Sequence, residues 1–518
     1  MSRVSMTLRN AWVAALFFLV YIIVQFYSRN IFLDKLGDEF IGIVGTLKSI
    51  LQFLNLSELG IGVAVGFSLY KPIYDDNKEK IIEIIGYLGF LYKRIGLFVL
   101  IASLLLLTFF PHIFDDVETN IGVIIFLFAS LVVSNLLSYF FAYHAFLLDA
   151  DQKSYVNITI NQSIFILRLI LQCLVLIYFE NLIYWILLEL LTPFLYIYIL
   201  RKRIRVMYPW LVFKFKISKE IRLKHKNLLK KIKQISFHKL GTFITNGTDN
   251  IIIFSFINPT MVAFVGNYQL IMNNVNTLVN QFFNGTNASV GNLVAENDQQ
   301  NIHKVFWEMM ALRFFFAGCG TVLLFIGFDD LITIWIGTKY IMDGNILIAL
   351  ILIFFILQVR QPVDSYIQAY GLYSDIWAPV VQSSINLVFS IVFVKMYGVI
   401  GVFIGTIISQ VSIVMLWRPY FLFSSGFRSS ILKYISGFFS HLLYLLISYL
   451  IFYCIFDWFN NKPSSNLFLL ILSLFKNGVV FSGIYFTVLI VLSNGFKDLF
   501  KRVKNLIKEK ISKKGKTN

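Results

Sequence analysis

Residues 281–291 read QFFNGTNASVG, a polar stretch inside a long apolar run. The stretch contains two formal N-glycosylation sequons, at Asn284 and Asn287, which a surface loop would expose. Residues 52–62 read QFLNLSELGIG, and at a constant offset of 229 residues the two stretches share Gln, Phe, Asn and Gly. We expect both in helices that cross from outside to inside, which indicates two lobes related by an axis along the membrane normal. Residues 281–291 are therefore interpreted as an intramembrane helix face and not as a glycosylated loop.

The composition supports a membrane setting for this repeat. Of the 518 residues, 58% are hydrophobic and 14% are charged, whereas a soluble protein is about 25% charged. A spanning helix needs ~20 mostly apolar residues, and such windows recur along the chain. We expect an all-α polytopic membrane protein of about 14 transmembrane helices, built as two six-helix lobes plus two C-terminal helices. The expected helices are 9–28, 40–71, 84–110, 120–147, 154–179, 182–201, 234–257, 260–296, 303–327, 341–371, 375–397, 399–422, 435–457 and 469–493.

The distribution of charge divides the chain and orients it. Thirteen of the 45 Lys and Arg residues fall in 201–233, and nine more fall in the C-terminal tail, whereas loops 33–39, 111–120 and 328–340 are acidic. Positive charge beside spans marks the cytoplasmic side and suits an anionic leaflet, so the net charge of +17 does not indicate nucleic acid. Both termini are expected in the cytoplasm. The expected domains are an N-terminal lobe (1–200), a basic cytoplasmic linker (201–233), a C-terminal lobe (234–425), two additional helices (426–493) and a basic tail (494–518).

Basic residues inside the apolar helices point to an anionic ligand. Each central Lys or Arg costs ~2.5–3.5 kcal/mol on the insertion scale unless it shares water, a partner or a ligand. Acidic residues are fewer in these segments, so the intramembrane excess is cationic. The candidates for an anion site are Arg29, Lys48, Arg168, Arg313 and Arg360.

Each of these cations also has a structural interpretation. Arg360 is placed to pair with Asp364 one turn later, and Arg313 has Glu308 five residues before it. Lys48 and Arg29 are near enough to helix ends to snorkel to the interface. Arg168 has no acidic residue in its own helix, which makes it the strongest cavity candidate. Pro362 removes a backbone hydrogen bond and is expected to kink its helix.

Asparagines recur at helical spacing and form stripes on three helices. Such faces suit a water-filled cavity or other helices and not lipid; the structural alternative is interhelical hydrogen bonding, worth under ~1 kcal/mol a bond. Two acids, Asp249 and Asp364, are candidates for proton or sodium coupling, with a salt bridge to a cavity base as the alternative. The candidate cavity-lining residues are Asn55, Asn157, Asn161, Asn273, Asn276, Asn280, Asn284 and Asn287.

Enzymatic signatures are missing from the sequence. It contains no G-x-x-x-x-G-K-[ST] phosphate loop, no H-E-x-x-H metal motif and no G-x-S-x-G elbow. The three cysteines lie far apart in apolar segments and suggest neither a disulfide framework nor a metal site. We expect no enzyme, no catalytic residue, no metal and no cofactor.

Several longer motifs resemble one family of transporters. They are FLNLSELGIGVAVGFSLYKPI (53–73), GTFITNGTDNIII (241–253), VGNYQLIMNNVNTLVNQFFNGTNASVGNLV (265–294), IQAYGLYSDIW (367–377) and GVIGVFIGTIISQ (398–410). The chain resembles, over about 7–493, the polysaccharide-unit flippases, which translocate O-antigen and capsule repeat units. These belong to the multidrug/oligosaccharidyl-lipid/polysaccharide exporter superfamily.

The resemblance implies a substrate and a mechanism. The substrate would be undecaprenyl-diphosphate-linked oligosaccharide, flipped to the external leaflet of the bacterial inner membrane by alternating access, for lipopolysaccharide or capsule synthesis. In that family a cationic cavity holds the diphosphate, a role that falls here to the five basic candidates, with the asparagines lining the cavity for sugar. The resemblance also implies a monomer in the lipid bilayer, with a polysaccharide polymerase and a chain-length regulator as partners and H⁺ or Na⁺ coupling as one driving force.

Three other functions stay open on the sequence. A cation-coupled multidrug exporter of the same superfamily would favour an acidic, aromatic cavity. A flippase for the lipid-linked peptidoglycan precursor would need the same diphosphate chemistry with another sugar. A membrane glycosyltransferase or polymerase usually carries catalytic acids on a sizeable external loop, whereas the loops expected outside here are short.

Overall fold

The computed structural model describes residues 3–55, 61–212, 247–283, 286–372, 374–458 and 466–514, and every regular element in these ranges is a helix. Eleven of the described helices are long and apolar enough to cross a membrane. The expected class, an all-α polytopic membrane protein, is confirmed. The helix expected over 234–257 and the linker expected over 201–233 lie largely outside the described residues.

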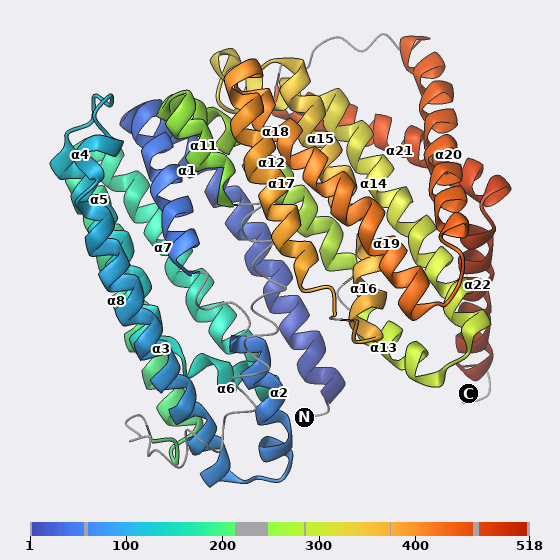
Figure 1. Ribbon diagram of the computed structural model, residues 1–518, viewed down its shortest axis with the longest axis horizontal. Helices are drawn as coiled ribbons and strands as arrows, with labels where there is room; N and C mark the ends of the chain where they lie inside the picture. Colours follow the sequence, from blue (N-terminus) through green and yellow to red (C-terminus); the bar gives the residue numbers. More distant parts are fainter. Residues whose placement is uncertain are drawn as a thin grey trace. The chain divides into compact units, whose positions relative to one another are not determined.

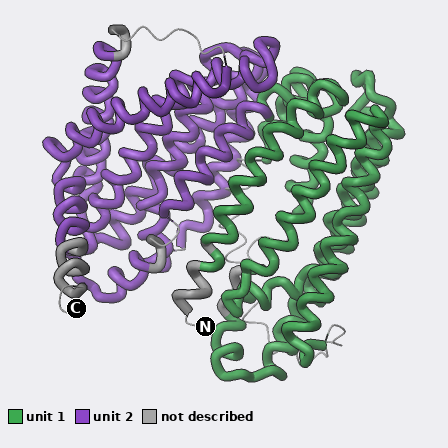
Figure 2. The backbone as a smooth tube through the Cα atoms, turned by 180° about the vertical axis from the view of Figure 1, so that it is seen from behind, with its two compact units in different colours: residues 1–266 green, residues 267–518 purple. Residues whose placement is uncertain are grey.

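Two compact units make up the chain, Met1–Gly266 and Asn267–Asn518, shown in green and purple in Figure 2. Unit 1 contains α1 (Arg3–Leu54), α2 (Ile61–Tyr74), α3 (Lys78–Leu107), α4 (Phe110–Ile113), α5 (Ile121–Leu137), the π-helix η2 (Ser138–Ala142), α6 (Ala145–Ala150), α7 (Ser154–Phe179), α8 (Leu182–Met207), α11 (Asp249–Phe256) and the start of α12 (Pro259–Phe282), labelled in Figure 1.

Glycine decides two features of α1. α1 covers the segment expected at 9–28 and the first part of the segment expected at 40–71, and it kinks between them at Gly37, whose φ of 78° lies in the left-handed region. The last part of the segment expected at 40–71 belongs to α2. Five residues after Gly37, α1 touches α12 at the level of the backbone. A Cβ on Gly42 would lie 1.7 Å from the carbonyl oxygen of Pro259. Only glycine permits this approach, which holds α12's first turn against α1.

The helix ends of unit 1 are capped by short polar side chains. Asn77, Asn120 and Asn181 each accept a hydrogen bond from backbone N–H groups in the first turns of α3, α5 and α8, which is the usual role of an N-cap asparagine. Glu180 ends α7 in a left-handed conformation. The turn at 180–181 therefore brings α8 back along α7, and the two helices pack together.

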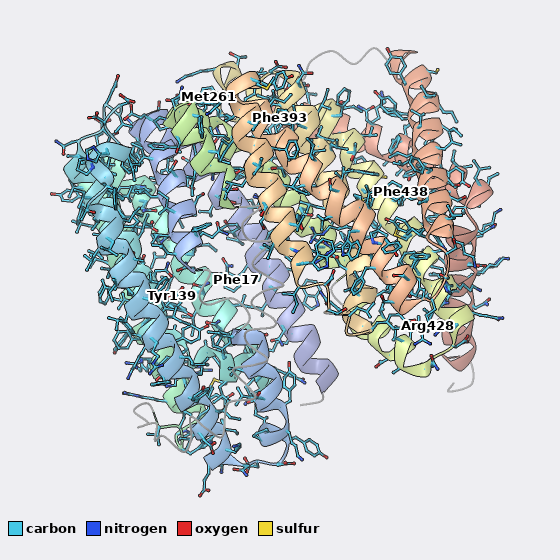
Figure 3. All side chains as sticks on the ribbon, in the orientation of Figure 1. Phe17, Tyr139, Met261, Phe393, Arg428 and Phe438 are labelled. Carbon is cyan, nitrogen blue, oxygen red and sulfur yellow. The ribbon has the colours of Figure 1, made fainter. Side chains whose placement is uncertain are left out.

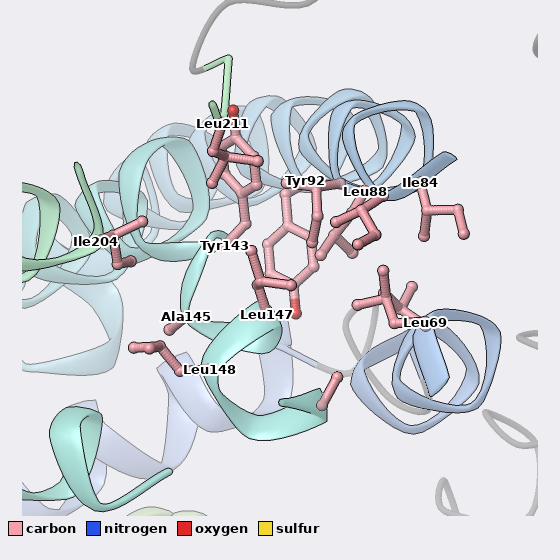
Figure 4. Close-up of a cluster of buried hydrophobic side chains, with 14 of the residues drawn as sticks. Leu69, Ile84, Leu88, Tyr92, Tyr143, Ala145, Leu147, Leu148, Ile204 and Leu211 are labelled. Atoms are coloured by element: carbon pink, nitrogen blue, oxygen red, sulfur yellow. The ribbon is translucent and has the colours of Figure 1, made fainter. Parts of the chain in front are cut away.

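A cluster of buried apolar side chains joins α2, α3, α6 and α8 in unit 1. Figure 4 shows Leu69 of α2, Leu88 and Tyr92 of α3, Leu147 of α6 and Ile204 of α8 among its members. Leu69, Leu88 and Ile204 are fully buried. Since lipid is as apolar as these side chains, the contacts gain stability from close van der Waals packing and not from exclusion of water.

Unit 2 contains the rest of the chain. Its elements are the remainder of α12, α13 (Thr286–Glu296), α14 (Gln299–Trp335), the 3₁₀ turn η3 (Thr338–Tyr340), α15 (Gly344–Val359), α16 (Gln361–Ala369), α17 (Trp377–Tyr397), α18 (Val399–Ser409), the π-helix η4 (Gln410–Trp417), α19 (Arg418–Phe421), the π-helix η5 (Leu422–Gly426), α20 (Ile431–Trp458), α21 (Leu467–Leu492) and α22 (Asn494–Lys514).

The helix expected over 341–371 is interrupted as its proline predicted. α15 ends at Val359, α16 begins at Gln361, and Pro362 occupies the first turn of α16, where its missing N–H costs nothing. The basic tail, expected at 494–518, is helical from Asn494 to Lys514 and lies alongside the start of α14 (Figure 1).

Candidate functional site

Arg168 of α7 forms a buried ion pair with Glu189 of α8. The guanidinium Nη1 donates to Glu189 Oε1 at 2.8 Å, and the two side chains are 13% and 7% exposed. Gln172, one turn after Arg168, donates to the carbonyl oxygen of Trp185 at 3.2 Å. The antiparallel packing of α7 and α8 brings this pair together. Sequence reasoning missed Glu189, although one acid inside the apolar run LIYWILLELLTPF was a visible signal.

Lys48 and Arg29 of α1 add positive charge to the same region. Lys48 is exposed, and its ammonium lies within electrostatic range of Arg29, Arg168 and Glu189. Arg29 Nη2 donates to the carbonyl oxygen of Ala263 at 3.1 Å. We call Arg29, Lys48, Arg168 and Glu189 the unit 1 cluster. It holds three cations against one carboxylate, so it carries net positive charge.

Arg313 of α14 is buried against neutral partners. Its side chain is 5% exposed, and Nη1 donates to Asn280 Oδ1 at 2.9 Å and to Gln358 Oε1 at 2.8 Å. The guanidinium lies 3.6 Å from the ring centroid of Phe283. Among the described residues, no carboxylate comes within ion-pair distance of Arg313. Glu308, the acid five residues before Arg313 in the sequence, pairs instead with Arg502, whose Nε lies 3.1 Å from Glu308 Oε2.

Two asparagines of α12 extend this arrangement into an amide network. Asn276 Oδ1 accepts hydrogen bonds from Asn280 at 3.4 Å and from Gln358. These contacts are hydrogen bonds within α12 and to α15, and Asn273 one turn earlier is exposed. The side chains of Asn284 and Asn287 lie outside the described residues. Sequence reasoning missed Gln358, a polar residue inside the apolar run ILIFFILQVR.

Arg360 pairs with Asp364 at the break between α15 and α16. Arg360 Nε lies 2.9 Å from Asp364 Oδ2, as the spacing of four residues predicted. The other oxygen of Asp364 accepts from Arg418, the first residue of α19, which sequence reasoning did not assign to this group. The three side chains are at most 19% exposed. Arg313 contacts the same segment through its hydrogen bond to Gln358, two residues before Arg360. We call Arg313, Arg360, Asp364 and Arg418 the unit 2 cluster, which comprises three cations and one carboxylate.

The remaining candidate residues are distributed over unit 1. Asn55 accepts hydrogen bonds from the Tyr139 hydroxyl at 2.7 Å and from Asn135 at 3.0 Å (Tyr139 is labelled in Figure 3). Asn157 accepts from Tyr196 at 2.8 Å. Both thus bond to neighbouring helical elements, whereas Asn161 is exposed.

Asp249 is the first residue of α11 and is buried, with 7% of its surface exposed. Its neighbour Asn250 donates to Ser49 Oγ of α1 at 3.0 Å. This contact holds the start of α11 on the same helix that carries Lys48.

Two titrating groups outside the spans have shifted pKa values. His144, between η2 and α6, is 1% exposed, and burial together with the nearby Arg201 charge lowers its pKa to about 4. Glu180, in the turn between α7 and α8, accepts a hydrogen bond from Lys35 at 2.6 Å. That contact with Lys35 lowers the pKa of the Glu180 carboxyl.

The two clusters share one chemical capacity. Guanidinium and ammonium groups bind phosphate oxyanions through charge-assisted hydrogen bonds, and amides from asparagine and glutamine both donate and accept hydrogen bonds. Positive charge beside amides therefore suits a ligand that carries both phosphate and hydroxyl groups.

Comparisons with known proteins define the fold. No protein-family model and no curated protein matches the chain. Among solved structures, the lipid II flippase MurJ in an inward closed conformation aligns with a TM-score of 0.65 and 17% identity over 93% of this chain and 98% of its own. An inward-facing multidrug resistance MATE family transporter of the MOP superfamily aligns with a TM-score of 0.60 and 14% identity, over 81% of this chain and 99% of its own.

An outward-facing MATE family transporter of the same superfamily gives a TM-score of 0.57 and 13% identity, over 82% of this chain and 96% of its own. At these identities the likeness concerns the fold. The chain is a multi-pass membrane protein with the helical fold that MurJ and the MATE transporters share.

Proposed function

We propose that this protein is a transporter that flips undecaprenyl-diphosphate-linked oligosaccharide units. The movement is from the cytoplasmic to the external leaflet of a bacterial inner membrane, for synthesis of a surface polysaccharide such as O-antigen or capsule. The observation that carries this proposal is the excess of cations inside spanning helices. Each of the two clusters has three basic side chains for one acid.

Arg313 gives the strongest support for an anionic ligand. Among the described residues, the partners of its buried guanidinium are amides and an aromatic ring, and none is a carboxylate. A basic residue at that depth costs ~2.5–3.5 kcal/mol on the insertion scale, and a bound diphosphate would offset that cost. Lys48, which is exposed beside Arg168, is the matching group of unit 1. We assign diphosphate binding to the cations of each unit taken by itself, and sugar binding to the amides of Asn276, Asn280 and Gln358 in unit 2.

The proposed transport cycle is alternating access. The lipid tail stays in the bilayer while the headgroup crosses, which requires the two compact units to change their placement during the cycle. An inside-negative potential favours outward movement of an anion, worth ~2.3 kcal/mol per charge for each 100 mV. If an ion is coupled, the candidates are Asp249 and Asp364, of which Asp364 pairs with Arg360 and Arg418.

The test is a flipping assay in proteoliposomes with a fluorescent lipid-linked oligosaccharide. The double variant Lys48→Gln/Arg313→Gln should lose at least about tenfold in initial rate, because each hydrogen bond to a charged group is worth about 1.5–3 kcal/mol. Lys78→Gln, an exposed cation of unit 1, is the control and should flip at the unmodified rate. An unchanged rate in the double variant would reject the proposal.

A second candidate is the flippase of the lipid-linked peptidoglycan precursor. MurJ aligns over 93% of this chain, whereas the MATE transporters named above align over 81–82%. Converted to residues of this chain, this difference in aligned share is close to the combined length of α20 and α21. Rescue of a strain that lacks its peptidoglycan-precursor flippase would favour this candidate over the repeat-unit substrate.

The multidrug and enzyme alternatives have separate readouts. A cationic drug would be repelled by clusters that are net positive, so expression should give no resistance to cationic dyes. A glycosyltransferase or polymerase would turn over lipid-linked sugar in detergent, without vesicles. We expect no such turnover, because the proposed work of this protein requires two membrane leaflets.

A further inference from the structure

α22 is a basic amphipathic helix that follows the last span directly. Its first part reads NGFKDLFKRVKN over 494–505, and Lys497, Lys501 and Lys504 recur at spacings of four and three, which places them on one face. Phe496, Phe500 and Val503 follow the same spacing on the neighbouring face. Helices of this composition lie at membrane surfaces more often than in water.

One side of α22 is fixed to α14 by a buried ion pair. Arg502 Nε lies 3.1 Å from Glu308 Oε2, and Nη2 donates to Oε1 at 3.2 Å. The Glu308 side chain is 3% exposed. Arg502 also donates to Asn301 at 3.4 Å, and Lys304 lies 3.8 Å from Asp498. The bidentate contact fixes the rotation of α22 about its own axis.

Apolar contacts fix the start of the helix in the same position. Phe496 is 4% exposed and packs against Phe315 of α14 and Phe486 of α21. A Cβ on Gly495 would lie 2.5 Å from the backbone oxygen of Trp307. The first three turns of α22 are thus held against α14 by backbone contact, aromatic packing and charge.

The face of α22 that carries Phe496 becomes exposed further along the helix, although the Phe500 ring centroid still lies 6.1 Å from that of Phe486. Phe500 is 49% exposed and Val503 is 44% exposed, and Lys501 and Lys504 are exposed beside them. Within the described part of the chain, no carboxylate lies within ion-pair distance of either lysine. This surface therefore combines exposed apolar side chains with uncompensated positive charge.

The length of α14 places this surface at the membrane boundary. Its 37 residues extend about 55 Å, whereas the hydrocarbon core is about 30 Å thick. Because the first turns of α14 carry Asn301, Lys304 and Glu308, we place this end of the helix beyond the hydrocarbon. α22 is attached to these turns, so its exposed lysines lie at the depth of the lipid headgroups.

We propose that α22 is a binding surface for anionic phospholipid headgroups of the adjoining leaflet. Lys501 and Lys504 contact the phosphates, while Phe500 and Val503 enter the interface between headgroups and acyl chains. The Arg502–Glu308 pair presents this surface by fixing the rotation of the helix. This inference does not depend on the transported substrate.

The test uses the full chain in detergent, with native mass spectrometry to measure binding of phosphatidylglycerol and of phosphatidylcholine. The unmodified protein should bind phosphatidylglycerol more tightly, and the preference should fall as salt is raised. Each lysine near an anionic surface contributes about fivefold in affinity. Lys501→Gln/Lys504→Gln should therefore weaken phosphatidylglycerol binding by about 25-fold and leave phosphatidylcholine binding unchanged.

Two controls separate this surface from a general effect of charge. Lys433→Gln removes an exposed cation of the same unit, at the start of α20, and should change the affinity less than twofold. Lys501→Arg/Lys504→Arg should retain binding. The proposal fails if the unmodified chain shows no preference for phosphatidylglycerol, if the double glutamine variant keeps it, or if Lys433→Gln lowers it equally. Hydrogen exchange across 494–505 verifies that α22 stays folded in each variant.

Discussion

Gln358 accepts a hydrogen bond from Arg313 at 2.8 Å, although the two residues are 45 positions apart and lie on different helices. An amide satisfies a guanidinium N–H without neutralising it. A glutamate at the same position would form an ion pair. Because residue 358 is a glutamine and not a glutamate, it does not neutralise the positive charge of Arg313 beside the Asn276–Asn280 network.

Gln358→Glu should therefore slow the proposed activity without damage to the fold. The new carboxylate would neutralise Arg313, and loss of one charge-assisted contact, about 2 kcal/mol, predicts a flipping rate at least about tenfold lower in proteoliposomes. Thermal unfolding in detergent should show equal or higher stability. Gln358→Met, which removes the amide without adding charge, is the matched control and should reduce flipping less. Full activity in Gln358→Glu would contradict the anion site.

Removal of the acid from the unit 1 ion pair should destabilise the protein. Glu189→Gln leaves the largely buried Arg168 without its carboxylate, and loss of one partner of a buried pair costs about 3–5 kcal/mol. The unfolding midpoint in detergent should fall accordingly. Arg168→Met/Glu189→Met should recover most of the loss, because no unpaired charge remains. A midpoint for Glu189→Gln within error of the unmodified protein would show that the pair is solvated.

Gly42→Ala should disrupt the packing of α1 on α12. The added methyl group would meet the Pro259 carbonyl at 1.7 Å, and overpacking of this severity costs about 3 kcal/mol. Gly66→Ala, in α2, is the matched control, since nothing lies within 4 Å of its added Cβ. That control should stabilise α2 by up to about 1 kcal/mol. Unfolding curves of both variants in the same detergent decide the outcome.

Stability should depend on pH through His144. Its pKa is about 4 in the folded protein against 6.5 for the ordinary group, so the unfolded chain binds the extra proton and stability falls as pH drops from 6.5 towards 4. By pH 5 this amounts to about 2 kcal/mol. His144→Gln should remove that part of the pH slope, whereas His112→Gln, an exposed histidine, should not. Equal slopes for all three proteins between pH 7.5 and 5 would exclude this role.

Much of the candidate site was visible in the sequence as single residues. Arg168, Arg313 and Arg360 stood out because a cation is rare in an apolar helix, and the pairing of Arg360 with Asp364 followed from their spacing on one helix. The α12 asparagines at 276 and 280 were also visible as polar residues in an apolar helix, and their role in lining a cavity stays a prediction. What the sequence did not show was the identity of partners on other helices, namely Glu189, Gln358 and Arg418.

Local chemistry accounts for what the sequence alone determined about this protein. In lipid every backbone group must be satisfied within its own segment, so the helical class, the spans and the break near Pro362 are properties of short stretches. Which side chains neutralise which charges depends on how helices pack. Glycine contacts such as Gly42 on Pro259 and the turn at Glu180 set that packing. Only the tertiary structure could therefore decide that Arg168 is paired with Glu189, that no carboxylate among the described residues pairs with Arg313, and that α22 is fixed to α14 through Arg502.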